Sequence, residues 1–195
     1  MWTLPNLLSL FRIAIIPALV YLLTFTDTDY RAALLAAVLF LLGSLTDFLD
    51  GYLARRRGSV SDLGRILDPL ADKLLIISVL IMLAGMGRLE EPKVPAWLVV
   101  VVVARETAVT ILRGISLTEG IVMEAEDLGK YKFILQSFAV FALLVHYQYA
   151  GIDFYATGMY FLVISTAVGL WSGVNYHVQF FRRFQRKTSA RGTRN

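Results

Sequence analysis

Six apolar stretches of roughly membrane-spanning length restrict what this sequence can fold into. A helix needs about 20 residues, at 1.5 Å each, to cross the hydrocarbon layer of a bilayer. Hydrophobic residues make up 57% of the 195 residues and charged residues only 17%, against roughly 45–50% and about 25% in soluble domains. We therefore predict an all-α integral membrane protein with six transmembrane helices. The predicted spans are Leu4–Phe25, Ala32–Ala54, Leu63–Met86, Pro95–Ile115, Phe133–Tyr149 and Phe154–Phe181.

The distribution of charge predicts how these spans are oriented. An even number of spans puts both termini on one side, together with the arginine-rich loop at 55–57 and the loop from 115 to 132. Because basic residues accumulate on the inner side of a membrane, we predict that this side is cytoplasmic. The chain then divides into a six-span domain, 1–181, and a basic cytoplasmic tail, 182–195. No nucleic-acid partner is predicted.

Four aspartates lie within two neighbouring spans. Asp47 and Asp50 are in the second span, and Asp68 and Asp72 are in the third. Each pair has the three- or four-residue spacing that puts both side chains on one helix face. Counting back from the short loop between the spans places Asp47 about 12 Å and Asp72 about 15 Å deep. Ionisable residues at such depth usually mark a functional site.

The four carboxylates predict a metal site. Unpaired charges in a low-dielectric pocket cost several kcal/mol each, so the acids must be protonated or must bind cations. The ligands are all oxygens and the chain has no cysteine, which favours Mg²⁺ or Mn²⁺. A pair of such ions is the usual arrangement for phosphoryl displacement. A single buried aspartate often serves only as a helix–helix hydrogen bond, but four at this spacing favour the functional interpretation.

Small residues beside the aspartates predict room for a nucleotide. Gly51 and Ala54 leave the helix surface bare next to the acids, and Gly64 does so on the facing helix. Arg55 is one turn from Asp50 and is able to reach a phosphate group. We therefore predict that these residues, with Asp47 and Asp50, line the binding site of a nucleotide-linked substrate.

The same segment carries a family resemblance. The stretch DFLDGYLARRRGSVSDLGRILDPLAD resembles the CDP-alcohol phosphotransferase signature D-x2-D-G-x2-A-R-x8-G-x3-D-x3-D. The resemblance implies that the aspartates hold two divalent ions, which bind the diphosphate of a CDP-linked lipid. It implies that Asp72 is the general base and that the protein is a homodimer among membrane lipids. The expected reaction transfers a phosphatidyl group from CDP-diacylglycerol to an alcohol and releases CMP.

Other charged residues suggest which alcohol is the acceptor. Arg105 falls in the middle of the fourth span, at the depth of the aspartates, and Arg113 lies near its cytoplasmic end. Lys130 and Lys132 precede the fifth span. A cationic lining suits an anionic acceptor such as a phosphorylated alcohol. The alternative is that Arg105 and its neighbour Glu106 satisfy other buried groups, while the lysines are ordinary positive-inside residues.

A second resemblance narrows the acceptor. The stretches PNLLSLFRIAIIP, VARETAVTILR and LGKYKFILQ are similar to those of bacterial phosphatidylglycerophosphate synthases. This implies sn-glycerol 3-phosphate as acceptor and the bacterial inner membrane as location, with a cytoplasmic active site. Phe133 departs from that group, which more often has threonine there. The alternatives are an enzyme that uses serine, inositol phosphate or phosphatidylglycerol, and a cation transporter that uses the four aspartates.

Overall fold

Helices dominate the computed structural model, which describes residues 4–25, 30–57, 62–85, 94–121 and 127–192. In several helical stretches, including 47–57, 62–69, residue 72 and residue 130, it describes the backbone only. The predicted helical class is confirmed for this part of the chain. Its helices are α1 (Leu4–Leu23), α2 (Tyr30–Arg57), α3 (Asp62–Gly85), α4 (Ala96–Thr118), α5 (Asp127–Val145) and α6 (Phe154–Gly192).

A short hairpin replaces the end of the fifth predicted helix. We predicted a helix to Tyr149, but α5 ends at Val145 and two-residue strands follow, β1 (Gln148–Tyr149) and β2 (Ile152–Asp153). The strands pair antiparallel, with Tyr149 opposite Ile152. Ala150 and Gly151 between them have φ of 52° and 79°, and two central residues with positive φ are what a type I′ turn requires. The predicted helix was wrong here because this turn reverses the chain.

The last helix also differs from its predicted length. We expected the span to end at Phe181, with a basic tail beyond it, but α6 continues to Gly192. Arginine, glutamine and lysine in this stretch are good helix formers. Lys187 also donates hydrogen bonds to the backbone carbonyl and the carboxylate of Glu119 at the end of α4. The helix therefore carries the basic residues beyond the apolar segment.

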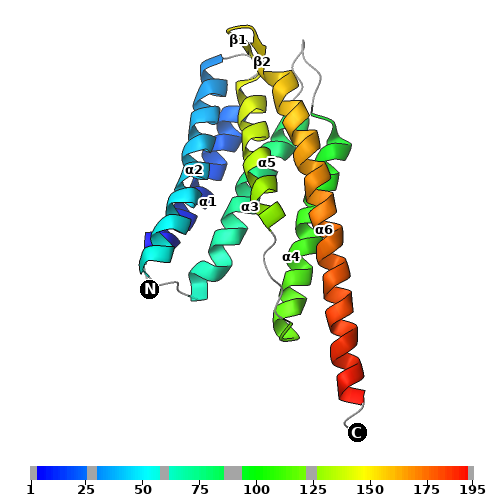
Figure 1. Cartoon of the computed structure of the whole chain (residues 1–195). Coiled ribbons are helices and arrows are strands. Elements are labelled where there is room, and N and C mark those ends of the chain that lie inside the picture. The colour runs from blue at the N-terminus through cyan, green and yellow to red at the C-terminus, as the bar shows by residue number, and fades with distance from the viewer. Residues whose placement is uncertain (1–3, 26–29, 58–61, 86–93, 122–126, 193–195) are drawn as a thin grey trace.

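The helices form a bundle in which α5 is central. It packs against α2, α3 and α6, while α1 packs on α2 and α3, and α4 packs on α3 and α6 (Figure 1). The start of α1 and the end of α6 lie at the same end of the bundle (Figure 1). Large hydrophobic side chains from all six helices form the core, among them Leu19, Phe40, Leu75, Leu98, Leu144 and Leu162.

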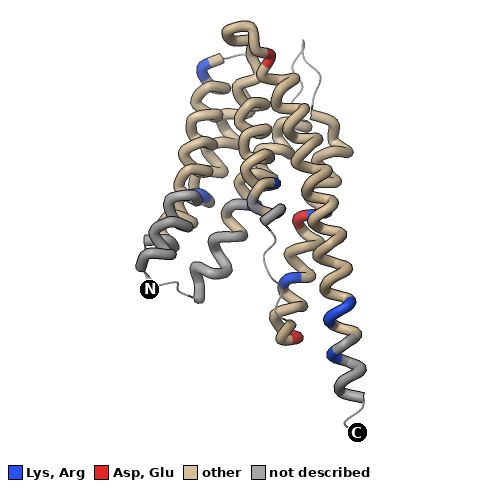
Figure 2. The backbone as a smooth tube through the Cα atoms, in the orientation of Figure 1, with Lys and Arg blue, Asp and Glu red and all other residues tan. Residues whose placement is uncertain are grey.

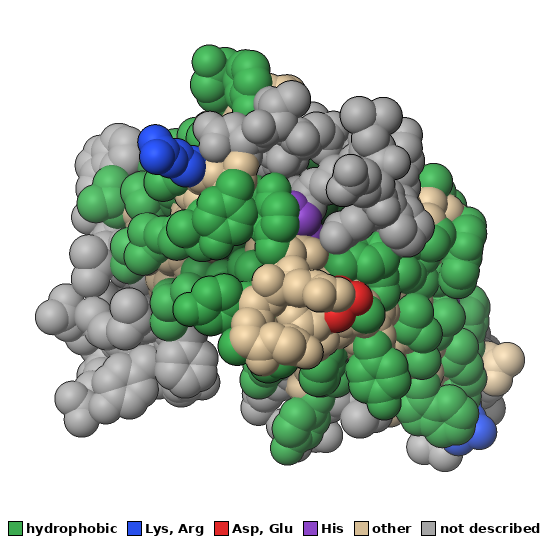
Figure 3. Space-filling view, turned by 90° about the horizontal axis from the view of Figure 1, so that it is seen from above, with side chains coloured by type: hydrophobic (Ala, Val, Ile, Leu, Met, Phe, Trp, Pro, Cys, Tyr) green, Lys and Arg blue, Asp and Glu red, His purple; other side chains and the backbone are tan. Residues whose placement is uncertain are grey.

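Many large hydrophobic side chains lie on the outside of the bundle. On α2, for example, Leu35, Leu42 and Leu45 are about half exposed. Hydrophobic side chains also cover most of the described surface at the end that carries the hairpin (Figure 3). Among the described residues, Phe154–Gln185 of α6 is long and apolar enough to cross a membrane, and four other helices contribute shorter apolar segments. Such an exterior is expected of a protein surrounded by lipid.

An uncharged layer separates two groups of charged residues in the bundle. Apart from Arg31 and Asp153 near the hairpin, the charged residues that the structure describes lie between the middle of the bundle and the end that contains both chain ends (Figure 2). Between these groups, the segments 13–23, 32–46, 74–85, 94–104 and 133–145 contain no charged residue. At 1.5 Å per residue this uncharged layer is about 20 Å thick. Among the described residues, the charges inside the bundle therefore lie on one side of this layer.

Candidate active site

The four aspartates lie on two helices that pack against each other. Asp47 and Asp50 belong to α2, and Asp68 and Asp72 belong to α3. Their side chains lie outside the described part, and of the predicted nucleotide-contacting residues Gly51, Ala54, Arg55 and Gly64 only the backbone is described. The described side chains hold no cluster of three or more acids or histidines suited to a metal ion. The predicted metal site therefore stays a prediction, supported by the helical backbone that carries it.

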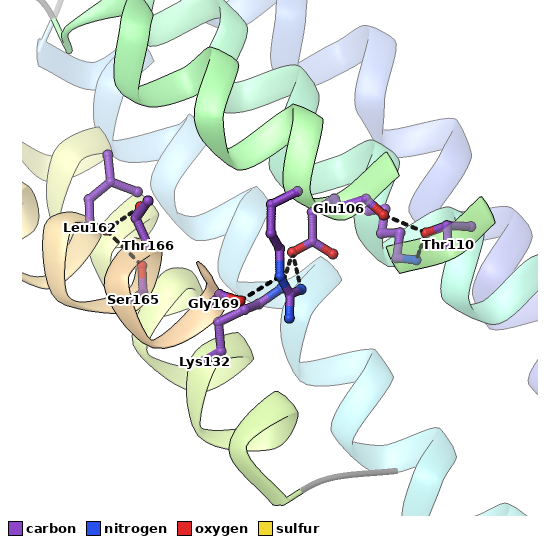
Figure 4. A network of polar contacts seen from close by, with 9 residues as sticks. Glu106, Thr110, Lys132, Leu162, Ser165, Thr166 and Gly169 are labelled. Atoms are coloured by element: carbon purple, nitrogen blue, oxygen red, sulfur yellow. Dashed lines mark hydrogen bonds and ion pairs between the residues drawn. The ribbon is translucent and has the colours of Figure 1, made fainter. Parts of the chain in front are cut away.

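A buried ionic cluster lies where α4, α5 and α6 meet. The Glu106 carboxylate pairs with Arg105 beside it on α4 and with Lys132 on α5 (Figure 4). Arg105 Nη1 and Lys132 Nζ both donate to the same oxygen, Glu106 Oε1. Arg105 Nε donates to the carbonyl oxygen of Gly169 on α6 at 2.8 Å. The three charged side chains are only 10–12% exposed. Two predicted acceptor-site residues, Arg105 and Lys132, are thus brought together by an acid.

Two close glycines on α6 make room for this cluster. A side chain at Gly169 would lie 3.2 Å from Lys132 Cδ, and one at Gly173 would lie 3.4 Å from Arg105 Nε. Both distances are at or below ordinary van der Waals contact. The basic side chains therefore pack directly against the α6 backbone.

The cluster is connected to the aspartate-bearing helix through Thr110. Lys73, which directly follows Asp72 on α3, donates a hydrogen bond to the Thr110 hydroxyl. That hydroxyl donates to the Glu106 carbonyl oxygen at 2.7 Å. A chain of contacts thus runs from α3 to the α4 turn that carries Glu106.

A small cavity adjoins the ionic cluster, and polar as well as apolar residues line it. Ser165 and Thr166 both donate to the carbonyl oxygen of Leu162 (Figure 4), and Gln136 is almost fully buried. The lining residues are Val102, Arg105, Glu106, Lys132, Gln136, Ser165, Thr166 and Gly169. Buried amide and hydroxyl groups in such a place commonly bind water or a polar ligand.

Of the two other predicted acceptor residues, Arg113 is described and is not part of this cluster. Arg113 lies eight residues beyond Arg105, about 12 Å along α4. It is exposed, with its guanidinium carbon 6.0 Å from the centre of the Tyr176 ring, where a cation–π interaction is possible. Lys130 lies on α5 with its side chain outside the described part. The structure thus groups Arg105 with Lys132 and separates Arg113 from them.

Three charged residues near this region were not predicted as site residues. Arg12 on α1 is fully buried, and α1 packs on both aspartate-bearing helices. Lys73 points to α4, and Glu106 is the centre of the ionic cluster. The rule that an ionisable residue within a span marks a functional site identified the aspartates. Applied to every span, it would have identified Arg12 and Glu106 as well.

The fold and the buried charges define a helical membrane protein with an ionic site between its helices. The family model described as CDP-alcohol phosphatidyltransferase matches residues 2–171 of this chain. The chain therefore belongs to the CDP-alcohol phosphatidyltransferase family, whose members are membrane-associated and generally metal-dependent. The predicted family is confirmed.

Similar proteins of known name support the same assignment. The chain is 39% identical over 184 residues to a CDP-diacylglycerol–glycerol-3-phosphate 3-phosphatidyltransferase of Bacillus subtilis, covering 88% of this chain and 93% of that protein. It is 41% identical to the protein of the same name from Rickettsia bellii, over 73% of this chain and 75% of that protein. An Arabidopsis thaliana protein, CDP-diacylglycerol–glycerol-3-phosphate 3-phosphatidyltransferase 2, is 31% identical over 95% of this chain and 82% of its own length.

Proposed function

We propose that this enzyme transfers the phosphatidyl group of CDP-diacylglycerol to sn-glycerol 3-phosphate in phospholipid biosynthesis. The products are phosphatidylglycerophosphate and CMP. The names of the similar bacterial and plant proteins support both substrates. The observation that carries the proposal for this chain is that Arg105 and Lys132 are both held at a buried position by ion pairs with Glu106. Two cations held together between helices suit the phosphate of an anionic acceptor.

The aspartates are suited to hold the metal ions of this family. Asp47, Asp50, Asp68 and Asp72 offer only carboxylate oxygens, the donors that Mg²⁺ and Mn²⁺ prefer. Two divalent ions bound there would neutralise the diphosphate of the donor. We propose that Gly51, Ala54, Arg55 and Gly64 contact the CDP group, with the small residues allowing close approach and Arg55 binding phosphate.

The transfer itself requires one bond to form and one to break. The acceptor hydroxyl oxygen forms a bond to the phosphorus that carries the diacylglycerol group. The bond between this phosphorus and the bridging oxygen of the diphosphate breaks, and that oxygen leaves with CMP. We assign removal of the hydroxyl proton to the Asp72 carboxylate, as the family resemblance implies. Lys73, the next residue along α3, is bonded to α4 through Thr110, which supports a fixed position for this part of the helix.

Six spans with both termini in the cytoplasm remain our proposed topology. It is supported by the uncharged layer between the two groups of charges and by the basic end of α6 (Figure 2). The active site would then face the cytoplasm from the bacterial inner membrane. We also propose a homodimer, as the family resemblance implies, and a basic cytoplasmic tail formed by residues 182–195.

Release of CMP from CDP-diacylglycerol, measured with a panel of acceptors, tests this function. We expect turnover with sn-glycerol 3-phosphate and hardly any with glycerol or serine. In the proposed topology Arg113 lies at the cytoplasmic end of α4, where it would bind the phosphate of the incoming acceptor. Arg113→Ala should therefore raise the acceptor KM more than the donor KM. Lys130→Ala should do the same. Preference for serine over glycerol 3-phosphate, or a normal acceptor KM in both variants, would refute this acceptor.

A further inference from the structure

Glu106 is an acid in a cluster that would otherwise attract anions. Its Oε1 atom accepts hydrogen bonds from both Arg105 and Lys132, as an oxygen of a bound phosphate would. Within the part of the chain that the structure describes, Arg105 uses Nε and Nη1 and leaves Nη2 unused. Lys132 Nζ makes one hydrogen bond there, to Glu106, although an ammonium group has three donors. Both cations therefore keep donors for a second anion.

The charges of the cluster show what Glu106 does to an incoming phosphate. Arg105 and Lys132 carry two positive charges, and Glu106 reduces the net charge of the three groups to one. A phosphate monoester carries about −1.5 to −2 at neutral pH. The carboxylate thus offsets about half of the charge that would attract the phosphate. It also occupies hydrogen bonds that the phosphate would otherwise receive.

The balance of charge between Glu106 and the two cations also affects release of the product. In the proposed reaction the acceptor phosphate is not altered, so the product carries the phosphate group that the acceptor brought. An interaction that binds acceptor and transition state equally lowers KM without raising kcat, and an interaction with an unaltered phosphate is retained in the product as well. Two unopposed buried cations would therefore hold the product as firmly as they hold the acceptor.

We propose that Glu106 is a positioning residue that acts as an internal counter-anion, competing with the acceptor phosphate for Arg105 and Lys132. It holds the two cations together while the site is free of acceptor. It also keeps the affinity for the phosphate low enough for the product to leave. This inference rests on the proposed function, because it takes the acceptor to be a phosphate monoester that binds at this cluster.

A purely structural role for Glu106 predicts a different result. If Glu106 served only to neutralise two buried cations, its removal would destabilise the protein without any gain in phosphate affinity. If it competes with phosphate, its removal increases that affinity. The sign of the change in acceptor KM therefore separates the two roles.

Kinetics of Glu106→Gln, in full-length protein purified in detergent, test the proposal. We expect the acceptor KM to fall about tenfold, equivalent to about 1.4 kcal/mol, and kcat to fall as product release slows. The donor KM should change less than twofold. Glu119→Gln is the matched control, since it removes an acid directly after the same helix, and the partner of that acid is the partly exposed Lys187. It should leave both KM values and kcat unchanged.

A binding measurement with inorganic phosphate provides a readout that does not need turnover. Phosphate should raise the Tm of Glu106→Gln by several degrees more than it raises the Tm of the wild type, at matched ionic strength. If Glu106→Gln does not fold even with phosphate present, Glu106→Asp replaces it. That variant keeps the charge but shortens the side chain, so the acceptor KM should fall about twofold to threefold.

The possible failures are distinguishable. An unchanged or higher acceptor KM in the folded variant, or equal stabilisation of variant and wild type by phosphate, would overturn the role of Glu106 alone. Wild-type enzyme that does not use glycerol 3-phosphate would refute the proposed function, and this inference with it.

Discussion

The contact between α5 and α6 at Gly158 allows a prediction of stability whose size follows from the structure. A methyl group at Gly158 would lie 2.7 Å from Leu143 Cγ, 2.9 Å from Leu143 N and 3.0 Å from the carbonyl oxygen of Ala139. Two of these atoms belong to the α5 backbone, so the helices must separate to admit it. Overpacking of this kind costs about 1–3 kcal/mol. Gly158→Ala should therefore loosen the central pair of helices.

Gly114 on α4 is the matched control for this substitution. It is also a helical glycine, but nothing lies within 4 Å of the position its side chain would take. Alanine is favoured over glycine in a helix by about 0.8–1.0 kcal/mol, and this gain is common to both substitutions. The difference between the two variants therefore isolates the packing cost. For about 2 kcal/mol and a chain of this length, the Tm values should differ by about 4–8 °C.

Thermal unfolding of both variants in the same detergent, followed by circular dichroism, measures this difference. Gly114→Ala should be as stable as the wild type or slightly more stable, and Gly158→Ala clearly less stable. Equal Tm values for the two variants would show that α5 and α6 do not approach each other as closely as the structure indicates.

Three further predictions concern the metal site, the base and the topology. Activity should require Mg²⁺ or Mn²⁺, and full turnover in excess EDTA would exclude the two-metal proposal. Asp72→Asn should lower kcat by about the 10²–10⁴-fold typical of a general base while the CDP-lipid still binds. Asp47→Asn should instead weaken binding of the donor. A near-normal kcat in Asp72→Asn would exclude Asp72 as the base. Because the chain has no cysteine, Arg56→Cys and Glu90→Cys allow impermeant labelling, expected from the cytoplasmic side at position 56 and from the outer side at position 90. Labelling of position 56 from outside would overturn the topology.

The sequence predicted the helices well where the physical signal is a long apolar run. It predicted the end of a helix less well where the residues stay apolar but the backbone turns. The segment from His146 to Tyr149 continues the apolar and aromatic character of α5, yet His146 has a φ of 45° and the hairpin follows. Ala150, unlike Gly151 beside it, gives no sign in the sequence that it adopts positive φ. Composition alone therefore extended the predicted helix too far.

The charged site was predictable in its members but not in its pairing. Sequence position indicated the depth of Arg105, since depth follows from the rise of a helix. It did not indicate which cation meets which acid, because that depends on how α4, α5 and α6 are rotated against one another. The rotation follows from contacts such as those of Gly169 and Gly173, which let the basic side chains approach α6.

A general physical constraint links the depth of a charge to its pairing. A buried cation without a partner is costly, so Arg105 requires an anion at its own depth. Among the described residues Glu106 meets this requirement, because it is adjacent to Arg105 and is itself buried. The same requirement applies to Lys132, and one carboxylate oxygen serves both. An anionic substrate that enters this site must then compete with a partner that the fold already provides, which is why the acid in the cluster affects acceptor affinity as well as stability.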